Sequence, residues 1–222
     1  MSRPVSIALP DRDSRFPDRV ALEQGDRRLA YADLDRGTAA VAASLLGARA
    51  DLGEARVAFL IEPSIDYVLV QRGVWRAGGV AVPLCASHPP PELDYVLADA
   101  QPELVVASPA LVDRLRPLAA ERGIELRSSG ELGTVTCRDS TGDCPQLPAL
   151  GPERRAMIVY TSGTTGGPKG AVTTHGALRA QMASLIEAWE WTPDDRIVLT
   201  LPLHHVHGIV NVLGCAIAAG AA

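Results

Sequence analysis

Short apolar runs alternate with helix-like segments along the first half of the chain, and this alternation constrains the fold more than any other feature. Residues 56–61, 80–84 and 104–107 are short and almost wholly apolar, which predicts buried strands. Residues 64–76 carry helical spacing, and the prolines at 89–91 fit the first turn of another helix. Such alternation implies β-α-β crossovers. We therefore expect an α/β fold with a largely parallel sheet sandwiched between helices.

Further elements are expected on both sides of this core. Residues 128–153 lack periodicity and are rich in Gly, Pro, Ser, Thr and Asp, which predicts a long surface connection with at most a short strand at 134–136. In chain order, the other expected elements are two strands around a turn at 24–26, a helix over 34–45 that stops near Gly47, a helix over 111–118, a strand at 124–126, a strand at 170–172, a helix capped by Thr174, a strand at 196–201 and an apolar, alanine-rich helix after Gly208.

Composition argues against several classes of protein. The 222 residues are 47% hydrophobic and 21% charged, as in soluble globular proteins, and hold no apolar run as long as a membrane span. A net charge of −5 argues against a general nucleic-acid binder. Residues 1–4 do not begin a secretory signal, so we expect a cytoplasmic location. The four cysteines are widely spaced, which predicts buried or incidental thiols in a reducing compartment.

A loop rich in glycine and hydroxyl side chains follows the apolar run at 157–159. Residues 160–170 read Tyr-Thr-Ser-Gly-Thr-Thr-Gly-Gly-Pro-Lys-Gly. The glycines let backbone N–H groups approach an anion, the hydroxyls add donors, and the lysine adds positive charge. Lys169 is the only lysine in the sequence, which indicates a role for a compact ammonium that a guanidinium would not replace. These residues predict an anion site, and we call residues 161–170 the glycine-rich loop.

Other phosphate-binding patterns do not fit the glycine-rich loop. A Walker A loop needs glycine directly before its lysine, and position 168 is proline; the order is not GxGxxG either. The order Thr-Ser-Gly-Thr-Thr-Gly-x-Pro-Lys-Gly resembles the phosphate-binding signature of the adenylate-forming (AMP-binding) superfamily, which includes acyl-CoA synthetases, peptide-synthetase adenylation domains and luciferases. Weaker similarities at 29–34 and 75–83 extend the resemblance along the chain. The alternative is an ordinary hairpin rich in small residues.

Three histidines lie close together in the segment Pro-Leu-His-His-Val-His-Gly, residues 202–208, which we call the histidine segment. It stands where the superfamily places a loop beside the acyl site, and the resemblance implies that His205 gates and orients the acyl substrate as a catalytic residue. For His204, satisfying buried backbone groups is the expected role. A zinc site would need further ligands, and no Cys, His or acidic cluster accompanies the histidines, so no metal site is expected.

The histidine segment, together with Trp-Glu-Trp-Thr at 189–192, looks most like malonyl-CoA synthetases. Malonate keeps a second carboxylate when the first is activated, and an imidazole such as that of His207, helped by an arginine, would bind it. In that subfamily such an arginine would come from sequence beyond Ala222. The alternative substrate is another short-chain or aromatic carboxylate.

The resemblance implies a two-stage reaction of ATP-dependent carboxylate–CoA ligases, enzymes of fatty acid metabolism. A carboxylate attacks the α-phosphate of ATP to give an acyl-adenylate and pyrophosphate, and the CoA thiol then displaces AMP. Positioning and electrostatics dominate such chemistry, with Mg²⁺ screening the triphosphate. The residues that would hold the β- and γ-phosphates are Thr161, Ser162, Gly163, Thr164, Thr165, Gly166 and Lys169.

Members of the superfamily are much longer than this chain. The resemblance therefore implies that residues 1–222 form an incomplete N-terminal AMP-binding domain, without the later nucleotide motifs and the C-terminal domain that carries a second lysine. We expect its last helix to leave apolar surface uncovered and the chain to assemble with a complementing C-terminal polypeptide if it is the natural form. Two other functions stay open: a non-catalytic nucleotide-binding or interaction module, and an adenylation domain that loads a carrier protein.

Overall fold

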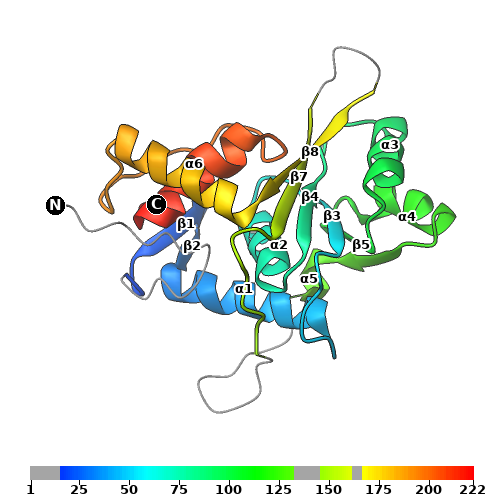
Figure 1. The fold of residues 1–222 in the computed structure, drawn as a ribbon, viewed down its shortest axis with the longest axis horizontal. Coiled ribbons are helices and arrows are strands. Elements are labelled where there is room, and N and C mark those ends of the chain that lie inside the picture. Colours follow the sequence, from blue (N-terminus) through cyan, green and yellow to red (C-terminus); the bar gives the residue numbers. More distant parts are fainter. Residues whose placement is uncertain (1–15, 133–145, 162–166) are drawn as a thin grey trace.

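A six-stranded sheet forms the centre of the part of the chain described by the computed structural model, residues 16–132, 146–161 and 167–222. Its strand order is β6-β5-β3-β4-β7-β8 (Figure 1). Strands β3 to β7 run parallel where they pair, and β8 returns antiparallel to β7 at one edge. The predicted α/β fold with a largely parallel sheet is confirmed. The strands are β3 (Arg56–Leu60), β4 (Val80–Pro83), β5 (Leu104–Ala107), β6 (Glu125–Ser128), β7 (Arg155–Thr161) and β8 (Lys169–Thr174).

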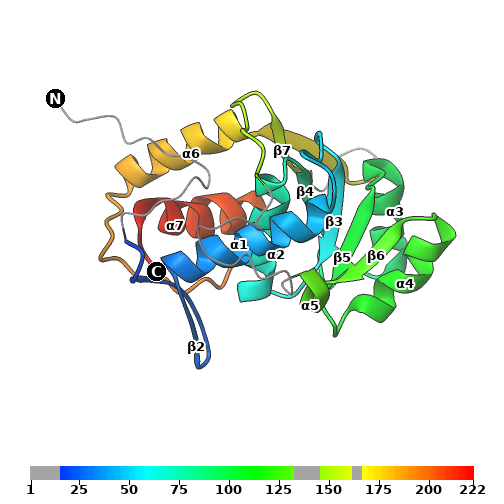
Figure 2. The same ribbon diagram turned by 90° about the horizontal axis from the view of Figure 1, so that it is seen from below.

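Helices cover both faces of this sheet, because alternate residues of the inner strands are apolar on both sides. In β3, Val57 and Phe59 pack into one cluster, whereas Ala58 and Leu60 pack into another, and all four are at most 2% exposed. Figure 2 shows α1 and α2 on one side of the sheet and α3 and α4 on the other. The helices are α1 (Tyr31–Leu46), α2 (Ile65–Arg76), α3 (Pro90–Ala100), α4 (Val112–Glu121), α5 (Ser129–Leu132), α6 (His175–Ala188), the π-helix η1 (His207–Gly214) and α7 (Cys215–Ala219).

Local sequence signals explain where several helices begin and end. The Ser64 hydroxyl accepts from the Tyr67 N–H at the start of α2, and the Thr174 hydroxyl accepts from the Ala177 N–H at the start of α6. At the end of α1, Gly47 adopts a positive φ of 54°, which favours glycine. The predicted cap at Thr174 and the predicted stop at Gly47 are confirmed.

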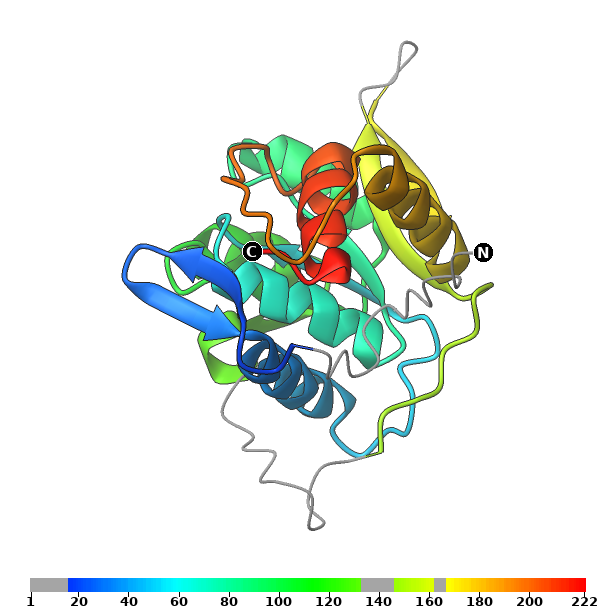
Figure 3. The same cartoon turned by 90° about the vertical axis from the view of Figure 1, so that its left-hand side faces the viewer.

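A separate two-stranded hairpin, β1 (Val20–Gln24) and β2 (Arg27–Ala30), precedes α1. Its turn at 24–26 is the predicted one. Figure 3 shows that η1 and α7 lie beside α2, with α6 on their other side. No helix in the described ranges has both the length and the apolarity needed to cross a membrane.

Three expectations about the end of the chain and the connection need correction. Residues 196–201 are not a strand: Val198 is 84% exposed, and no described strand pairs with the segment, so its apolar run has no ladder to join. The last helical segment is not left uncovered, since Val210 and Ile217 are buried in the main core. The connection also contains the short helix α5, and the strand expected at 134–136 lies outside the described residues.

The two described cysteines are consistent with the predicted buried thiols. Cys85 and Cys215 are free and buried, and burial raises the pKa of the Cys215 thiol to about 11. Cys137 and Cys144 lie outside the described residues.

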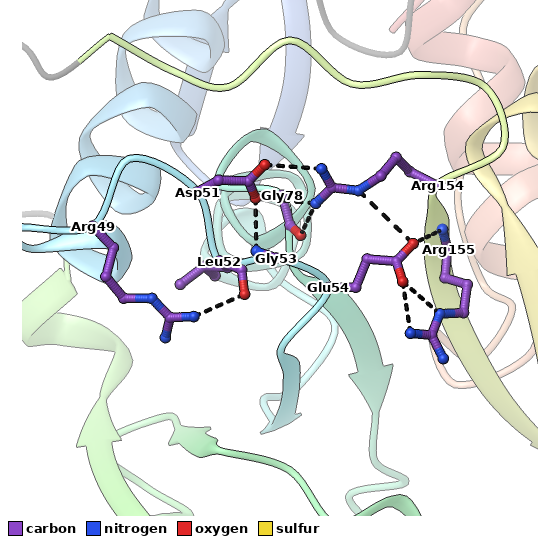
Figure 4. Close-up of polar contacts among 8 residues, drawn as sticks. All are labelled: Arg49, Asp51, Leu52, Gly53, Glu54, Gly78, Arg154 and Arg155. Carbon is purple, nitrogen blue, oxygen red and sulfur yellow. Dashed lines mark hydrogen bonds and ion pairs between the residues drawn. The ribbon is translucent and has the colours of Figure 1, made fainter.

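A network of ion pairs joins the segments that enter the sheet at the amino ends of its parallel strands (Figure 4). Arg154 donates to both carboxylate oxygens of Asp51, at 2.8 and 3.0 Å, and to the carbonyl oxygen of Gly78 at 2.8 Å. Glu54 accepts from the backbone N–H and the Nε of Arg155, each at 2.7 Å. The Arg154 guanidinium lowers the pKa of Asp51. These ion pairs and hydrogen bonds hold the segments before β3, β4 and β7 together, and we call them the ion-pair clamp.

Candidate functional site

The loops that the sequence analysis identified lie at the opposite end of the sheet, at the carboxyl ends of the parallel strands. We call this end of the sheet the ligand edge. Strands β4 and β7 are parallel neighbours, with Ala81 paired to Met157. The loop after β4 and the glycine-rich loop after β7 therefore leave the sheet at the same edge (Figure 1). Ligands of open α/β sheets bind in crevices outside the carboxyl ends of the strands. This edge is the candidate site.

The β7–β8 hairpin brings the two ends of the glycine-rich loop together. Thr161, the last residue of β7, is the register partner of Lys169, the first residue of β8. Both residues are exposed, and Lys169 forms no ion pair with any acidic residue in the described part of the chain. The predicted residues Ser162, Gly163, Thr164, Thr165 and Gly166 lie outside the described residues. Lys169 thus lies where the loop returns to the sheet, with no acidic partner among the described residues.

Helix α3 holds the returning arm of the loop. The Tyr95 hydroxyl donates to the carbonyl oxygen of Pro168 at 3.0 Å. A Cβ atom on Gly167 would lie 2.7 Å from Cζ of Tyr95, so glycine permits this close approach. Tyr95 was missed at the sequence level, where it is only one aromatic residue of a predicted helix.

The strand that enters the loop is also tied to α3. The Tyr160 hydroxyl donates to the Asp99 carboxylate at 2.6 Å, and burial together with this bond raises the pKa of Tyr160. A cavity of about 230 Å³ lies beside the pair, and Arg56 and Arg155 are among its lining residues. Arg56 already donates to the Gln101 carbonyl and Arg155 to Glu54, so both arginines among the described lining residues are engaged within the protein.

The histidine segment reaches the same edge of the sheet. The ring of His204 lies 4.2 Å from the ring of His205 and 6.0 Å from that of His88, between ring centroids, and His88 belongs to the loop after β4. Helix α2 anchors the segment, because the Tyr67 hydroxyl donates to the Leu203 carbonyl. Burial lowers the pKa of His204 to about 4, with smaller contributions from the charges of His205 and His88. His204 is therefore a neutral, packed imidazole near pH 7.

The two histidines predicted to contact the acid are more exposed than His204. His205 is exposed, and its carbonyl accepts from the Ile209 N–H at 3.1 Å. His207 is the first residue of η1, and its Nδ1 lies 3.4 Å from Nδ2 of Asn211. The Asn211 Oδ1 in turn accepts from the Gln181 side chain of α6 at 2.6 Å. This chain of contacts orients the His207 ring, and the side chains of His205 and His207 are both exposed.

A metal centre has no ligand set in the described ranges. No three His, Cys, Asp or Glu side chains of the described chain come together as metal ligands, although three histidines gather at His204.

His88 is, after Tyr95, a second residue of the site that the sequence analysis missed. Its position four residues after the predicted strand at 80–84 was the available signal, because the residues that follow parallel strands lie at the end of the sheet where ligands bind.

Known proteins resemble this chain along nearly its whole length. The family described as "AMP-binding enzyme" matches residues 9–222. A protein from Bos taurus named mitochondrial malonate–CoA ligase is 38% identical over 224 residues, covering 99% of this chain and 38% of its own length. A Xenopus laevis protein of the same name is 45% identical over 168 residues, covering 75% of this chain and 29% of its own length. The chain thus spans well under half the length of these curated relatives.

Solved structures share the fold as well. MatB from Rhodopseudomonas palustris in its apo form superposes with a TM-score of 0.82 at 28% identity, over 92% of this chain and 41% of that one. An ATP-bound structure of MatB from the same organism gives a TM-score of 0.80 at 30% identity, with the same coverage. The described sheet and its covering helices are therefore those of an adenylate-forming fold.

Proposed function

The chain belongs to the AMP-binding enzyme family, and we propose that it acts as the N-terminal adenylation region, residues 1–222, of an ATP-dependent carboxylate–CoA ligase. The observation that carries the proposal is the β7–β8 hairpin, which sets Thr161 opposite Lys169 at the ligand edge of the sheet, where Lys169 has no acidic partner among the described residues. The relatives named malonate–CoA ligases support the choice of a carboxylic acid and CoA as substrates.

The glycine-rich loop holds the β- and γ-phosphates of ATP in this proposal. Lys169 supplies the charge that stabilises departing pyrophosphate, and Thr161 supplies a hydroxyl from the other arm. The predicted contacts of Ser162, Gly163, Thr164, Thr165 and Gly166 complete the phosphate site. The ATP-bound relative with the same fold makes ATP the nucleotide of choice.

The histidine segment binds the acid. His205 orients the carboxylate that reacts, and His207, whose ring is oriented through Asn211, binds the second carboxylate of malonate or a related short-chain acid. In the first stage an oxygen of the acid attacks the α-phosphorus, the bond to the β-phosphate oxygen breaks, and pyrophosphate leaves. In the second stage the CoA sulfur, having lost its proton, attacks the acyl carbon and AMP leaves, which forms the thioester.

Mg²⁺ stays a prediction as an ion carried by the triphosphate. The described residues do not assemble a cation site of their own, and the Asp99 carboxylate beside the end of β7 already accepts the Tyr160 hydroxyl. Mg²⁺ in such sites is held largely by substrate phosphates and water.

The cytoplasmic location, the link to fatty acid metabolism and assembly with a complementing C-terminal polypeptide also stay predictions. The mammalian and amphibian relatives are named mitochondrial.

Acid-dependent exchange of pyrophosphate into ATP tests the proposed function. The 222-residue chain, and any longer form encoded by the same gene, are incubated with ATP, Mg²⁺ and a panel containing malonate, succinate, acetate and benzoate. We expect exchange that is fastest with malonate and is lost in Lys169→Ala. His207→Ala should slow exchange with malonate more than with acetate, because acetate has no second carboxylate. Absence of exchange from every form with every acid would reject a ligase.

A further inference from the structure

The contact between His88 and His204 joins two segments that are far apart in the sequence. Their ring centroids are 6.0 Å apart at an interplanar angle of 56°, and His204 then packs on His205 at 4.2 Å and 50°. Tilted aromatic pairs at these separations are attractive. The three rings form a continuous row that runs from the loop after β4 to the histidine expected to contact the acid.

The loop that carries His88 is held firmly from the helix side. The Arg114 guanidinium of α4 donates to the carbonyl oxygen of Ala86 and, at 2.6 Å, to that of His88. On the ring itself, Nδ1 of His88 lies 3.4 Å from the Glu92 carboxylate in the first turn of α3. His88 is therefore a fixed part of the sheet edge against which another side chain can rest.

The histidine segment is held by its backbone and by one buried side chain. Its residues 202–205 form no helix or strand. Leu203 is buried in the main core and its carbonyl accepts from the Tyr67 hydroxyl, the His205 N–H donates to the Pro202 carbonyl at 3.4 Å, and η1 begins at His207. Between these anchors the only side-chain ring contacts of His204 in the described chain are with His205 and His88. Removing the His88 ring would remove the ring contact that His204 makes with the loop after β4.

We propose that His88 is a positioning residue for the acid site, whose ring braces His204 and thereby fixes His205 at the ligand edge of the sheet. The inference rests on the proposed function for the identity of the ligand, but the brace itself is a property of the free chain. The role belongs to the ring and not to its charge, so phenylalanine at position 88 should replace histidine and alanine should not.

The titration of His204 reports on the brace without any substrate. In the described part of the chain, the charged or titratable groups close to the three rings are His205, His88 and, next to His88, Glu92, while the Arg114 guanidinium contacts the His88 carbonyl. Burial is the largest cause of the low pKa of His204, about 4 against an ordinary 6.5. Loss of the His88 ring would hydrate His204 and raise its pKa, whereas phenylalanine would keep the burial and remove only the weaker charge effect.

The experiment combines imidazole NMR titration with kinetics. The sequence has five histidines, so each Cε1–H resonance is assigned by a single His→Gln variant. In His88→Ala and His88→Gln we expect the pKa of His204 to move up toward about 6.5, and in His88→Phe to stay low.

In the exchange assay, KM for malonate should rise about 2- to 10-fold in His88→Ala, with KM for ATP unchanged and His88→Phe near wild type. Glu92→Gln is the matched control, because it removes the charged neighbour of His88 and keeps its ring.

The outcomes separate the inference from the proposed function. An unchanged His204 titration in folded His88→Ala or His88→Gln would overturn the brace, whatever the enzyme activity. Equal behaviour of His88→Phe and His88→Ala would overturn the ring as the acting group. If the His204 pKa rises in His88→Ala but neither the 222-residue chain nor any longer form catalyses exchange, the brace is supported and the ligase function is rejected.

Discussion

The Tyr160 hydroxyl donates a 2.6 Å hydrogen bond to the Asp99 carboxylate, and this bond ties the end of β7 to the end of α3 one residue before the glycine-rich loop begins. Tyr95, one turn earlier in α3, holds the returning arm through Pro168. Helix α3 therefore holds both the strand that enters the loop and the segment that leaves it. These two hydrogen bonds hold the residues directly before Thr161 and Lys169, the two ends of the loop.

Removing the Tyr160 hydroxyl should loosen this attachment. Tyr160→Phe keeps the ring and loses the hydrogen bond, so we expect a loss of about 0.5–1 kcal/mol in the free energy of unfolding, at the low end because the acceptor is exposed. Asp99→Asn, which keeps an acceptor oxygen, is the control and should lose less. Urea unfolding followed by circular dichroism makes the comparison. Equal stability of Tyr160→Phe and wild type would show that the bond contributes nothing.

A substitution at Gly78 should disrupt the ion-pair clamp at the other end of the sheet. Gly78 has a φ of +79°, and a Cβ there would lie 2.1 Å from Oδ1 of Asp51 and 2.9 Å from Nη2 of Arg154. Gly78→Ala therefore combines backbone strain with displacement of a half-buried ion pair, and we expect it to cost about 3 kcal/mol. Gly25→Ala is the matched control.

The control isolates the backbone part of this cost. Gly25 also has a positive φ, +58°, but nothing lies within 4 Å of its Cβ position. We expect Gly25→Ala to cost only about 1 kcal/mol. The difference between the two variants in thermal or urea unfolding measures the contribution of the clamp. Equal costs would mean that Asp51 and Arg154 adjust freely around an added methyl group.

Histidine 175 should make the fold sensitive to mild acid. It is 1% exposed, packs edge-on against Trp75, and burial lowers its pKa to about 4, against an ordinary 6.5. The unfolded chain then binds a proton that the folded chain does not, so stability should fall as the pH drops from 6.5 toward 4. His175→Phe should flatten this decline.

The pH dependence is checked by urea unfolding at pH 7, 6, 5 and 4.5. His207→Gln is the control, since that imidazole is exposed to water in the folded chain, and it should decline as wild type does. The neutral His204 contributes to the decline in all three proteins. A His175→Phe variant that loses stability as steeply as wild type would contradict the assignment of a neutral buried imidazole.

Strands were predictable from the sequence where burial on both faces removes the polar alternation. The run at 56–61 is apolar because β3 is central, with β5 and β4 on its two sides. The run at 196–201 is nearly as apolar but has no described strand as its neighbour, so the prediction of a strand there was wrong. An apolar run signals burial in a sheet only if a partner strand is available, and the sequence pattern does not name the partner.

The candidate site was predictable in the parts that one local motif carries. Thr161 and Lys169 were identified from the glycine-rich loop, and the histidine segment from three histidines in four residues. Tyr95 and His88 were not, because their contacts with Pro168 and His204 depend on how the loop after β4 and α3 pack against distant segments. Pairings of that kind arise from topology and are invisible in local spacing.

Nucleotide binding by Lys169 variants tests the central claim most directly, because it needs no turnover. Calorimetric titrations of wild type, Lys169→Ala and Lys169→Arg compare ATP with AMP, which lacks the β- and γ-phosphates. We expect Lys169→Ala to weaken ATP binding about tenfold or more and to leave AMP binding unchanged, with Lys169→Arg between wild type and alanine. Unchanged ATP affinity in Lys169→Ala, or equal losses for ATP and AMP, would contradict a phosphate-binding role for the glycine-rich loop.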